Sequence, residues 1–244
     1  MTIAPIDQEN RKDAFVRRFE ELIISGEFPI GSRLPGEREL ATMLGVSRPI
    51  VREGLVELQS MGLVSMRSRS GTVVNDYRRK GSLALLKALF KYDKGVPGQE
   101  FFKGMMEMRM LFEVECARLA ALRRPESAIH DFRSLLEEEG RLPEKDAEAW
   151  VDVDFRFHHL IALSTGNPVF PLQMNSLGPF YRSMTRIFYS DHTVIPDIRR
   201  FHSELVRAID GKDEAGAVRE MKRMLEEGEE RLDFLLSRRE EESA

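Results

Sequence analysis

The sequence predicts a mainly α-helical protein in two parts, a small N-terminal domain with one β-hairpin and a C-terminal bundle of six or seven helices. Apolar residues recur at helical spacing through most of the chain, and β-prone runs occur only between residues 63 and 75. A polar, aperiodic stretch then separates the two parts. Since 244 residues are sufficient for two domains, we expect domains at 1–75 and 83–244, joined by a linker at 76–82.

Composition restricts the possible settings of the chain. Its net charge is −4, so any contact with nucleic acid must be local. The single cysteine, Cys116, can form neither an internal disulfide nor a cysteine zinc site, which fits a reducing compartment. The N-terminus has no signal-peptide pattern, and no apolar run approaches the roughly 18 residues of a membrane helix. We therefore expect a soluble, cytoplasmic protein without a membrane contact.

The first domain is expected to fold as three helices followed by a hairpin. The first helix covers 11–25, the second ends at Gly45, and the third runs from Ser47 as N-cap to Gly62. The second domain shows long amphipathic segments with Gly or Pro at the joints. These segments are expected at about 83–93, 98–123, 125–139, 144–164, 168–190, 195–210 and 213–237.

Two short helices around Gly45 form a helix-turn-helix pattern, which presents the first turn of its second helix to base edges. Arg48 and Arg52 lie one turn apart on one face, and arginine can bind guanine or phosphate through two hydrogen bonds. An ordinary solvated surface is the alternative explanation. The predicted contact residues at this turn and at the hairpin tip are Ser47, Arg48, Pro49, Arg52, Arg67, Ser68, Arg69 and Gly71.

The stretch GSRLPGERELATMLGVSRPIVREGLVELQSMGLVSMRSRSGTVV resembles the winged helix-turn-helix of the GntR family of bacterial transcription regulators. The matching pieces are G-x-x-LP-x-ERELA, GVSR-x-x-VRE-x-L and L-x-x-x-GLV. This resemblance implies that Arg38 also contacts DNA, that Arg33 binds phosphate and that the wing reaches the minor groove. It further implies a homodimer on a pseudo-palindromic double-stranded operator, and repression more than activation.

In the second domain, Asp154 and His158 are one helical turn apart, and His202 lies on a later helix. Two imidazoles and a carboxylate are a known set of metal ligands. A helix-surface ion pair and buried structural histidines are the alternative. Spacing leaves both open.

The helical half resembles the FadR-type, or FCD, effector domain of GntR regulators. The matching segments are EMRMLFEVECARLAA, DFRFHHLIALSTGNPVF and FHSELVRAIDGKDEAGAVREM. The resemblance implies one divalent ion (Zn, Ni or Mn) on Asp154, His158 and His202, with Met224 where the family has a fourth ligand, a histidine. It also implies that Arg109 binds the carboxylate of an organic-acid effector, and Asn167 is a second candidate contact.

Two other functions stay open from the sequence. GSLALLKALF and TGNPVFPLQMNSLGPFYRSMTRIFY are similar to the acyl-CoA-sensing FadR branch, which implies a fatty acyl-CoA effector. A non-haem metal enzyme is a remote alternative, because the same three ligands occur in iron oxygenases. That chemistry usually lies on a β-barrel, and no catalytic motif stands out, so we do not expect an enzyme.

Overall fold

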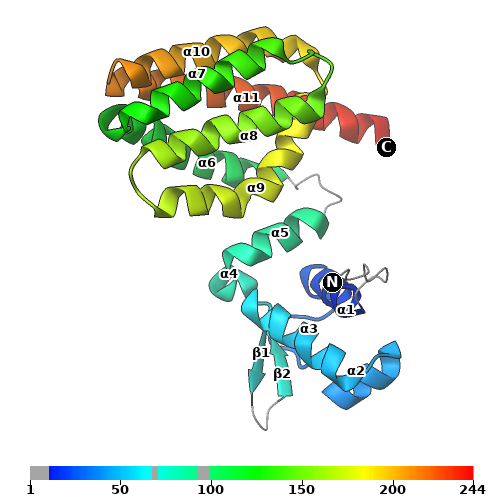
Figure 1. Ribbon diagram of the computed structural model, residues 1–244. Coiled ribbons are helices and arrows are strands. Elements are labelled where there is room, and N and C mark those ends of the chain that lie inside the picture. Colours follow the sequence, from blue (N-terminus) through cyan, green and yellow to red (C-terminus); the bar gives the residue numbers. More distant parts are fainter. Residues whose placement is uncertain (1–10, 68–70, 93–98, 244) are drawn as a thin grey trace, which may run out of the picture. The chain divides into compact units, whose positions relative to one another are not determined.

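The computed structural model describes residues 11–67, 71–92 and 99–243, and the chain divides after Gly95 into two compact units (Figure 1). The first unit contains five helices and one hairpin in its described part. Their bounds are α1 (Arg11–Ile24), α2 (Glu37–Leu44), α3 (Arg48–Ser60), β1 (Val64–Arg67), β2 (Gly71–Val74), α4 (Tyr77–Lys80) and α5 (Leu83–Tyr92). The predicted order of three helices and a hairpin is therefore confirmed.

The hairpin is a short antiparallel pair whose register matches Val64 with Val74 and Arg67 with Gly71. The loop before α2 runs beside β2, where Arg33 forms a β-bridge with Val73. Gly62 ends the α3 turn with a φ of 84°, a conformation that glycine adopts without steric cost. A Cβ there would also collide with the carbonyl of Lys80.

The core of the first unit forms where α1 crosses α3. Val51, Leu55 and Leu58 of α3 are fully buried, as their helical spacing predicts. Gly54 lies on the same face, and a Cβ at this position would come within 2.3 Å of the Phe15 ring. The close approach of α1 to α3 therefore depends on the missing side chain of Gly54.

The boundary of the first unit differs from the expected one. The expected linker contains α4, whose N-terminus is capped by the Asp76 carboxylate, and Ser82 N–H donates to the carbonyl of Met61 at 3.0 Å. Leu85 of α5 is then buried in the N-terminal core. Local hydrogen bonding and one apolar contact thus join residues 76–92 to the first unit, whereas polarity alone had suggested a free linker.

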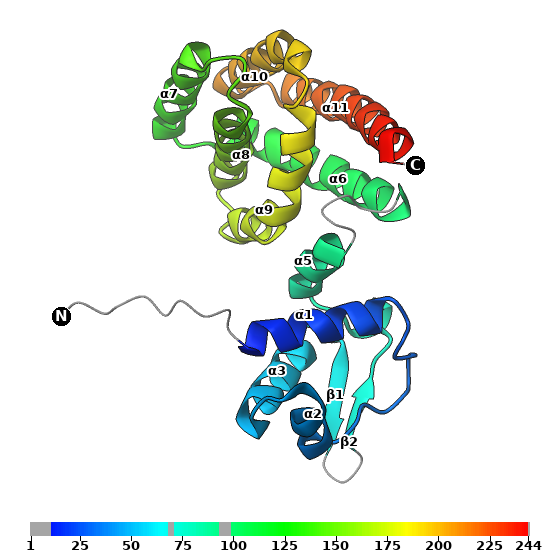
Figure 2. The same cartoon turned by 90° about the vertical axis from the view of Figure 1, so that its right-hand side faces the viewer.

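The second unit is a bundle in which α6 packs against α8 and α11, and α10 packs against α7 and α11 (Figures 1 and 2). Its described helices are α6 (Gln99–Arg123), α7 (Glu126–Arg141), α8 (Ala147–Ser164), α9 (Val169–Phe188), the 3₁₀ turn η1 (His192–Val194), α10 (Ile195–Asp210) and α11 (Glu214–Ser243). Trp150, Phe132 and Phe157 are fully buried among them. Among the described helices, none is both long and apolar enough to cross a membrane.

We predict that Gly54→Ala destabilises the first unit. Alanine favours a helix over glycine by about 1 kcal/mol, but overpacking a core costs about 1–3 kcal/mol, so the clash with Phe15 prevails. Urea unfolding followed by circular dichroism should show a lower free energy of unfolding. Gly140→Ala in α7 is the control, because no atom lies within 4 Å of its added Cβ. Equal stability of the two variants would contradict the packing argument.

Candidate effector site and nucleic-acid interface

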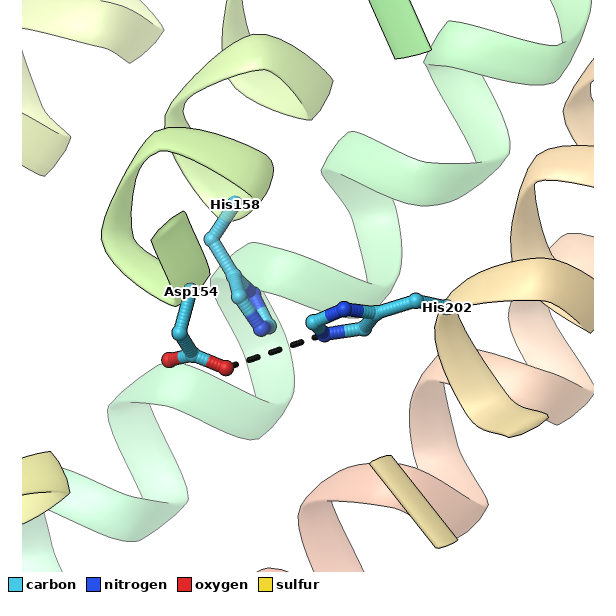
Figure 3. Close-up of side chains that lie close together, drawn as sticks. All are labelled: Asp154, His158 and His202. Atoms are coloured by element: carbon cyan, nitrogen blue, oxygen red, sulfur yellow. Dashed lines mark ion pairs between the residues drawn. The ribbon is translucent and has the colours of Figure 1, made fainter. Parts of the chain in front are cut away.

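The predicted metal ligands meet inside the second unit. Asp154 and His158 project from one face of α8, and His202 faces them from α10 (Figure 3). One ligand atom from each side chain lies within 4.8 Å of the others, and all three residues are buried. Ligand atoms about 2.1 Å from one ion are at most about 4.2 Å apart, so these groups need to move only slightly to share an ion.

Each imidazole has a buried carboxylate behind it. Glu113 of α6 contacts His158 Nδ1, and Glu139 of α7 lies 2.7 Å from His202 Nδ1. A carboxylate on the far ring nitrogen orients a metal-binding imidazole and raises its basicity. This arrangement leaves the Nε2 atom of each ring for the centre of the cluster.

His202 Nε2 has no hydrogen-bond partner among the described residues, although it is buried. Its distance to Asp154 Oδ1 is 3.7 Å, which is too long for a hydrogen bond. A protonated Nε2 in this place would be expected to donate to that oxygen at a shorter distance. The orphaned nitrogen therefore fits a lone pair that is directed at an ion.

Two tyrosine hydroxyls hold the Asp154 carboxylate in place, one from α9 and one from the residue that directly follows this helix. Tyr181 donates to Oδ2 at 2.6 Å, and Tyr189 donates to Oδ1 at 2.8 Å. Burial, followed by the charge of Asp154, raises the pKa of both tyrosines well above that of an ordinary phenol. Both hydroxyls therefore stay protonated and act as donors at neutral pH.

Arg109 of α6 connects the effector hypothesis to the same cluster. Its Nε donates to Glu113 at 2.6 Å, and its guanidinium lies 4.6 Å from the centre of the Tyr181 ring. Burial has the largest single effect and raises the pKa of Glu113, but the charges of Arg109 and His158 and their hydrogen bonds together lower this pKa to about 2. Arg109 and Glu113 lie one helical turn apart on α6, so their buried ion pair also gives Arg109 a structural role.

Electrostatics favour a cation at this site. The cluster holds three carboxylates, those of Glu113, Glu139 and Asp154, and one guanidinium, that of Arg109, so with neutral imidazoles its charge is −2. Uncompensated buried charge is costly, so two positive charges are needed, either from protonated imidazoles or from a bound cation. One divalent ion on Asp154, His158 and His202 would supply them.

A small cavity of about 40 Å³ adjoins the cluster and is lined by Arg109, Asp154, His158 and Met224. Such a volume holds roughly three water molecules. Met224 projects from α11, is buried and lines this cavity together with Asp154 and His158. Its thioether prefers softer ions than an imidazole does.

Asn167 lies elsewhere. Its side-chain oxygen accepts from Val169 N–H at 3.0 Å and closes a turn just before α9, and Asn167 does not line the described cavity. The turn geometry explains this residue without a ligand.

The candidate DNA-contacting residues gather in the first unit. Ser47 is the N-cap residue of α3, and its hydroxyl makes no capping hydrogen bond. Pro49 follows in the first turn, where a missing N–H has no cost. Figure 1 shows α2, the start of α3 and the free end of the hairpin on the side of this unit away from α4. Ser68 and Arg69 lie outside the described residues, between Arg67 and Gly71.

The five candidate arginines of the first unit are exposed, and their guanidinium groups have no hydrogen bond or ion pair within the described residues. They are Arg33, Arg38, Arg48, Arg52 and Arg67. Glu57, a candidate partner for Arg52, is instead paired with Lys12 at 2.7 Å. Free guanidinium groups at a helix start and at a hairpin tip are suited to phosphates and base edges.

The sequence did not identify the Glu139 carboxylate or the hydroxyls of Tyr181 and Tyr189 as parts of this site. Glu139 continues the buried stripe of α7 that includes Ile129, Phe132 and Leu135, so an acid at an apolar position was the available signal. Nothing in the spacing of Tyr181 and Tyr189 along the chain relates them to Asp154.

Comparisons with known proteins agree with this geometry. Residues 12–74 match the model of the "Bacterial regulatory proteins, gntR family", and residues 104–227 match that of the FCD domain. The HTH-type transcriptional regulator Mce2R of Mycobacterium tuberculosis is 30% identical over 93% of both chains. A fatty acid metabolism regulator protein of Klebsiella pneumoniae is 28% identical over 78% of this chain and 77% of its own.

A solved structure, described as Lar, which controls the expression of the Listeria monocytogenes agr system, covers 96% of this chain and all of its own with a TM-score of 0.62. At 18% identity it supports the fold alone. The family models and the relatives support more, since together they span both units. The chain therefore belongs to the GntR family of bacterial transcription regulators, in the group that carries an FCD effector domain.

Proposed function

We propose that the protein is a homodimeric repressor whose affinity for its operator is controlled by an organic acid bound in the FCD domain. The observation that carries the proposal is the coexistence of unpaired arginines on the first unit with a buried Asp/His/His cluster beside Arg109 in the second. Two copies of the first unit would read two half-sites of an imperfect palindrome. The effector would act by binding one conformation of the dimer more tightly than the other.

We infer that Arg48 and Arg52 contact base edges, with Arg33, Arg38 and the wing on the phosphates and the adjacent groove. Support comes from their exposure at the start of α3 and from the absence of internal partners in the described chain. Bidentate arginine contacts with guanine contribute about 1–3 kcal/mol of discrimination each.

We also propose that a divalent ion (zinc, nickel or manganese) binds to Asp154, His158 and His202. The charge of −2 in the cluster, the orphaned His202 Nε2 and the carboxylates behind both imidazoles support this assignment. When bound, the ion would act as a Lewis acid that holds a carboxylate oxygen of the effector. Arg109 would orient the same carboxylate, and Tyr181 and Tyr189 would keep Asp154 in place.

The size of the described cavities favours a compact effector over a fatty acyl-CoA. The larger cavity near the cluster measures about 240 Å³, whereas sites for drug-sized ligands occupy roughly 300–1,000 Å³ and an acyl-CoA exceeds such ligands. The relatives named as fatty acid metabolism regulators keep the acyl-CoA hypothesis as the alternative. A small organic acid would fit this volume, with its carboxylate on the proposed ion and Arg109.

We predict that Arg48→Ala lowers affinity for an operator selected from a random duplex library by about 1–3 kcal/mol, because a bidentate base contact is lost. Fluorescence anisotropy would measure the binding, and thermal unfolding should be unchanged. Arg79→Ala removes the same charge from α4, at the opposite end of this unit, and should bind like the wild type. Wild-type affinity of Arg48→Ala would refute the assignment.

Elemental analysis of freshly purified protein should find close to one divalent ion per chain, and His202→Ala should lose it. His130→Ala is the matched control, because His130 is exposed on α7, away from the cluster. A wild-type protein that carries no ion and takes up none on dialysis against zinc would remove the metal from the proposal.

Glu139→Gln should weaken zinc binding by roughly 10–100-fold, as loss of an outer carboxylate does at other histidine sites. Competition with a chromophoric chelator would measure the affinity. Glu138→Gln, one residue earlier and exposed in a pair with Arg156, should bind zinc like the wild type. Equal affinities of the two variants would show that Glu139 does not support the site.

A further inference from the structure

A second cavity adjoins the one beside the cluster. It measures about 240 Å³ and lies between η1, α10 and α11. Four lining residues are common to both cavities, namely Phe188, Ile198, Met224 and Gly228. Because the same residues border both spaces, only these residues lie between the larger cavity and the one beside the cluster.

The larger cavity has an apolar floor and a polar rim. Phe188, Ile198 and Phe201 are buried in its floor, whereas Asp197 and Glu227 are exposed at its edge. A concave apolar surface with a few polar groups is the usual form of a small-molecule site. An acid that enters here with its carboxylate first would leave its carbon chain on the floor.

Gly228 lies at the junction of the two cavities. It is one helical turn after Met224 on α11, so both face the same space. No heavy atom lies within 4 Å of a Cβ built at Gly228, and a larger side chain could therefore extend into the passage. Glycine inside a helix is about 1 kcal/mol less favourable than alanine. The stability of α11 therefore does not explain a glycine at this position.

We propose that Gly228 keeps open the passage between the two cavities and thereby sets the chain length of the organic acid that the protein senses. The inference rests on the proposed function and goes beyond it: the effector is a monocarboxylate with an extended apolar chain, which lies over Phe188 and Ile198. A compact acid such as acetate would fill only the inner cavity.

The test is calorimetric titration of the purified full-length protein with acetate, butyrate and hexanoate. Wild-type affinity should rise by roughly fourfold for each added methylene, as burial of a CH₂ group predicts. In Gly228→Leu this gain should vanish, so that hexanoate binds no better than acetate. Metal content and operator binding without added acid should be unchanged, because Gly228 is not one of the three proposed metal ligands and lies outside the first unit.

Gly140→Leu is the matched control, since it adds the same side chain to an exposed helical position. Leucine is more favourable than glycine in both helices, so unfolding would not explain a loss of binding. Gly140→Leu should keep the rise in affinity with the chain length of the acid. If acetate and hexanoate bind the wild type equally, or if Gly228→Leu keeps the gain, the passage is refuted while the organic-acid function stands. If none of the acids binds, the proposed effector class fails as well.

Discussion

The buried carboxylate of Asp154 is the constraint around which the second unit is arranged. A charge in the interior must be solvated by the protein, and here two phenols donate to it while two imidazoles face it. Those groups come from α8, α9 and α10, so the packing of three helices depends on one carboxylate. The carboxylates behind the imidazoles extend the same network to α6 and α7.

This network explains why the site lies deep in the bundle. Side chains of a core are held in single conformations by close packing, which fixes ligand groups better than a loop would. Two cavities adjoin the cluster and share Met224 and Gly228 in their lining. The two proposals therefore concern neighbouring spaces in the same bundle.

The arginines of the candidate DNA surface differ in their partners from those of the second unit. In the second unit Arg109, Arg124 and Arg156 are bound to carboxylates or carbonyl groups of the same chain. Arg48 and Arg52 of the first unit make no such bond within the described chain. A guanidinium that has an internal partner stabilises a fold, and one that has none is available for a phosphate or a base. This difference supports a DNA-facing unit and a ligand-facing unit within a chain of net negative charge.

Much of this was predictable from local sequence. Helical spacing and the Gly and Pro joints located the helices, and the i, i+4 spacing placed Asp154 and His158 on one face, because both are properties of a few neighbouring residues. Spacing could not show that Glu139 and Tyr189 meet this cluster, nor that 76–92 joins the first unit. Those contacts link residues far apart in the chain, and their partners depend on how the helices pack. The cavity beside Gly228 is of the same kind, since the empty volume belongs to α9, α10 and α11 together.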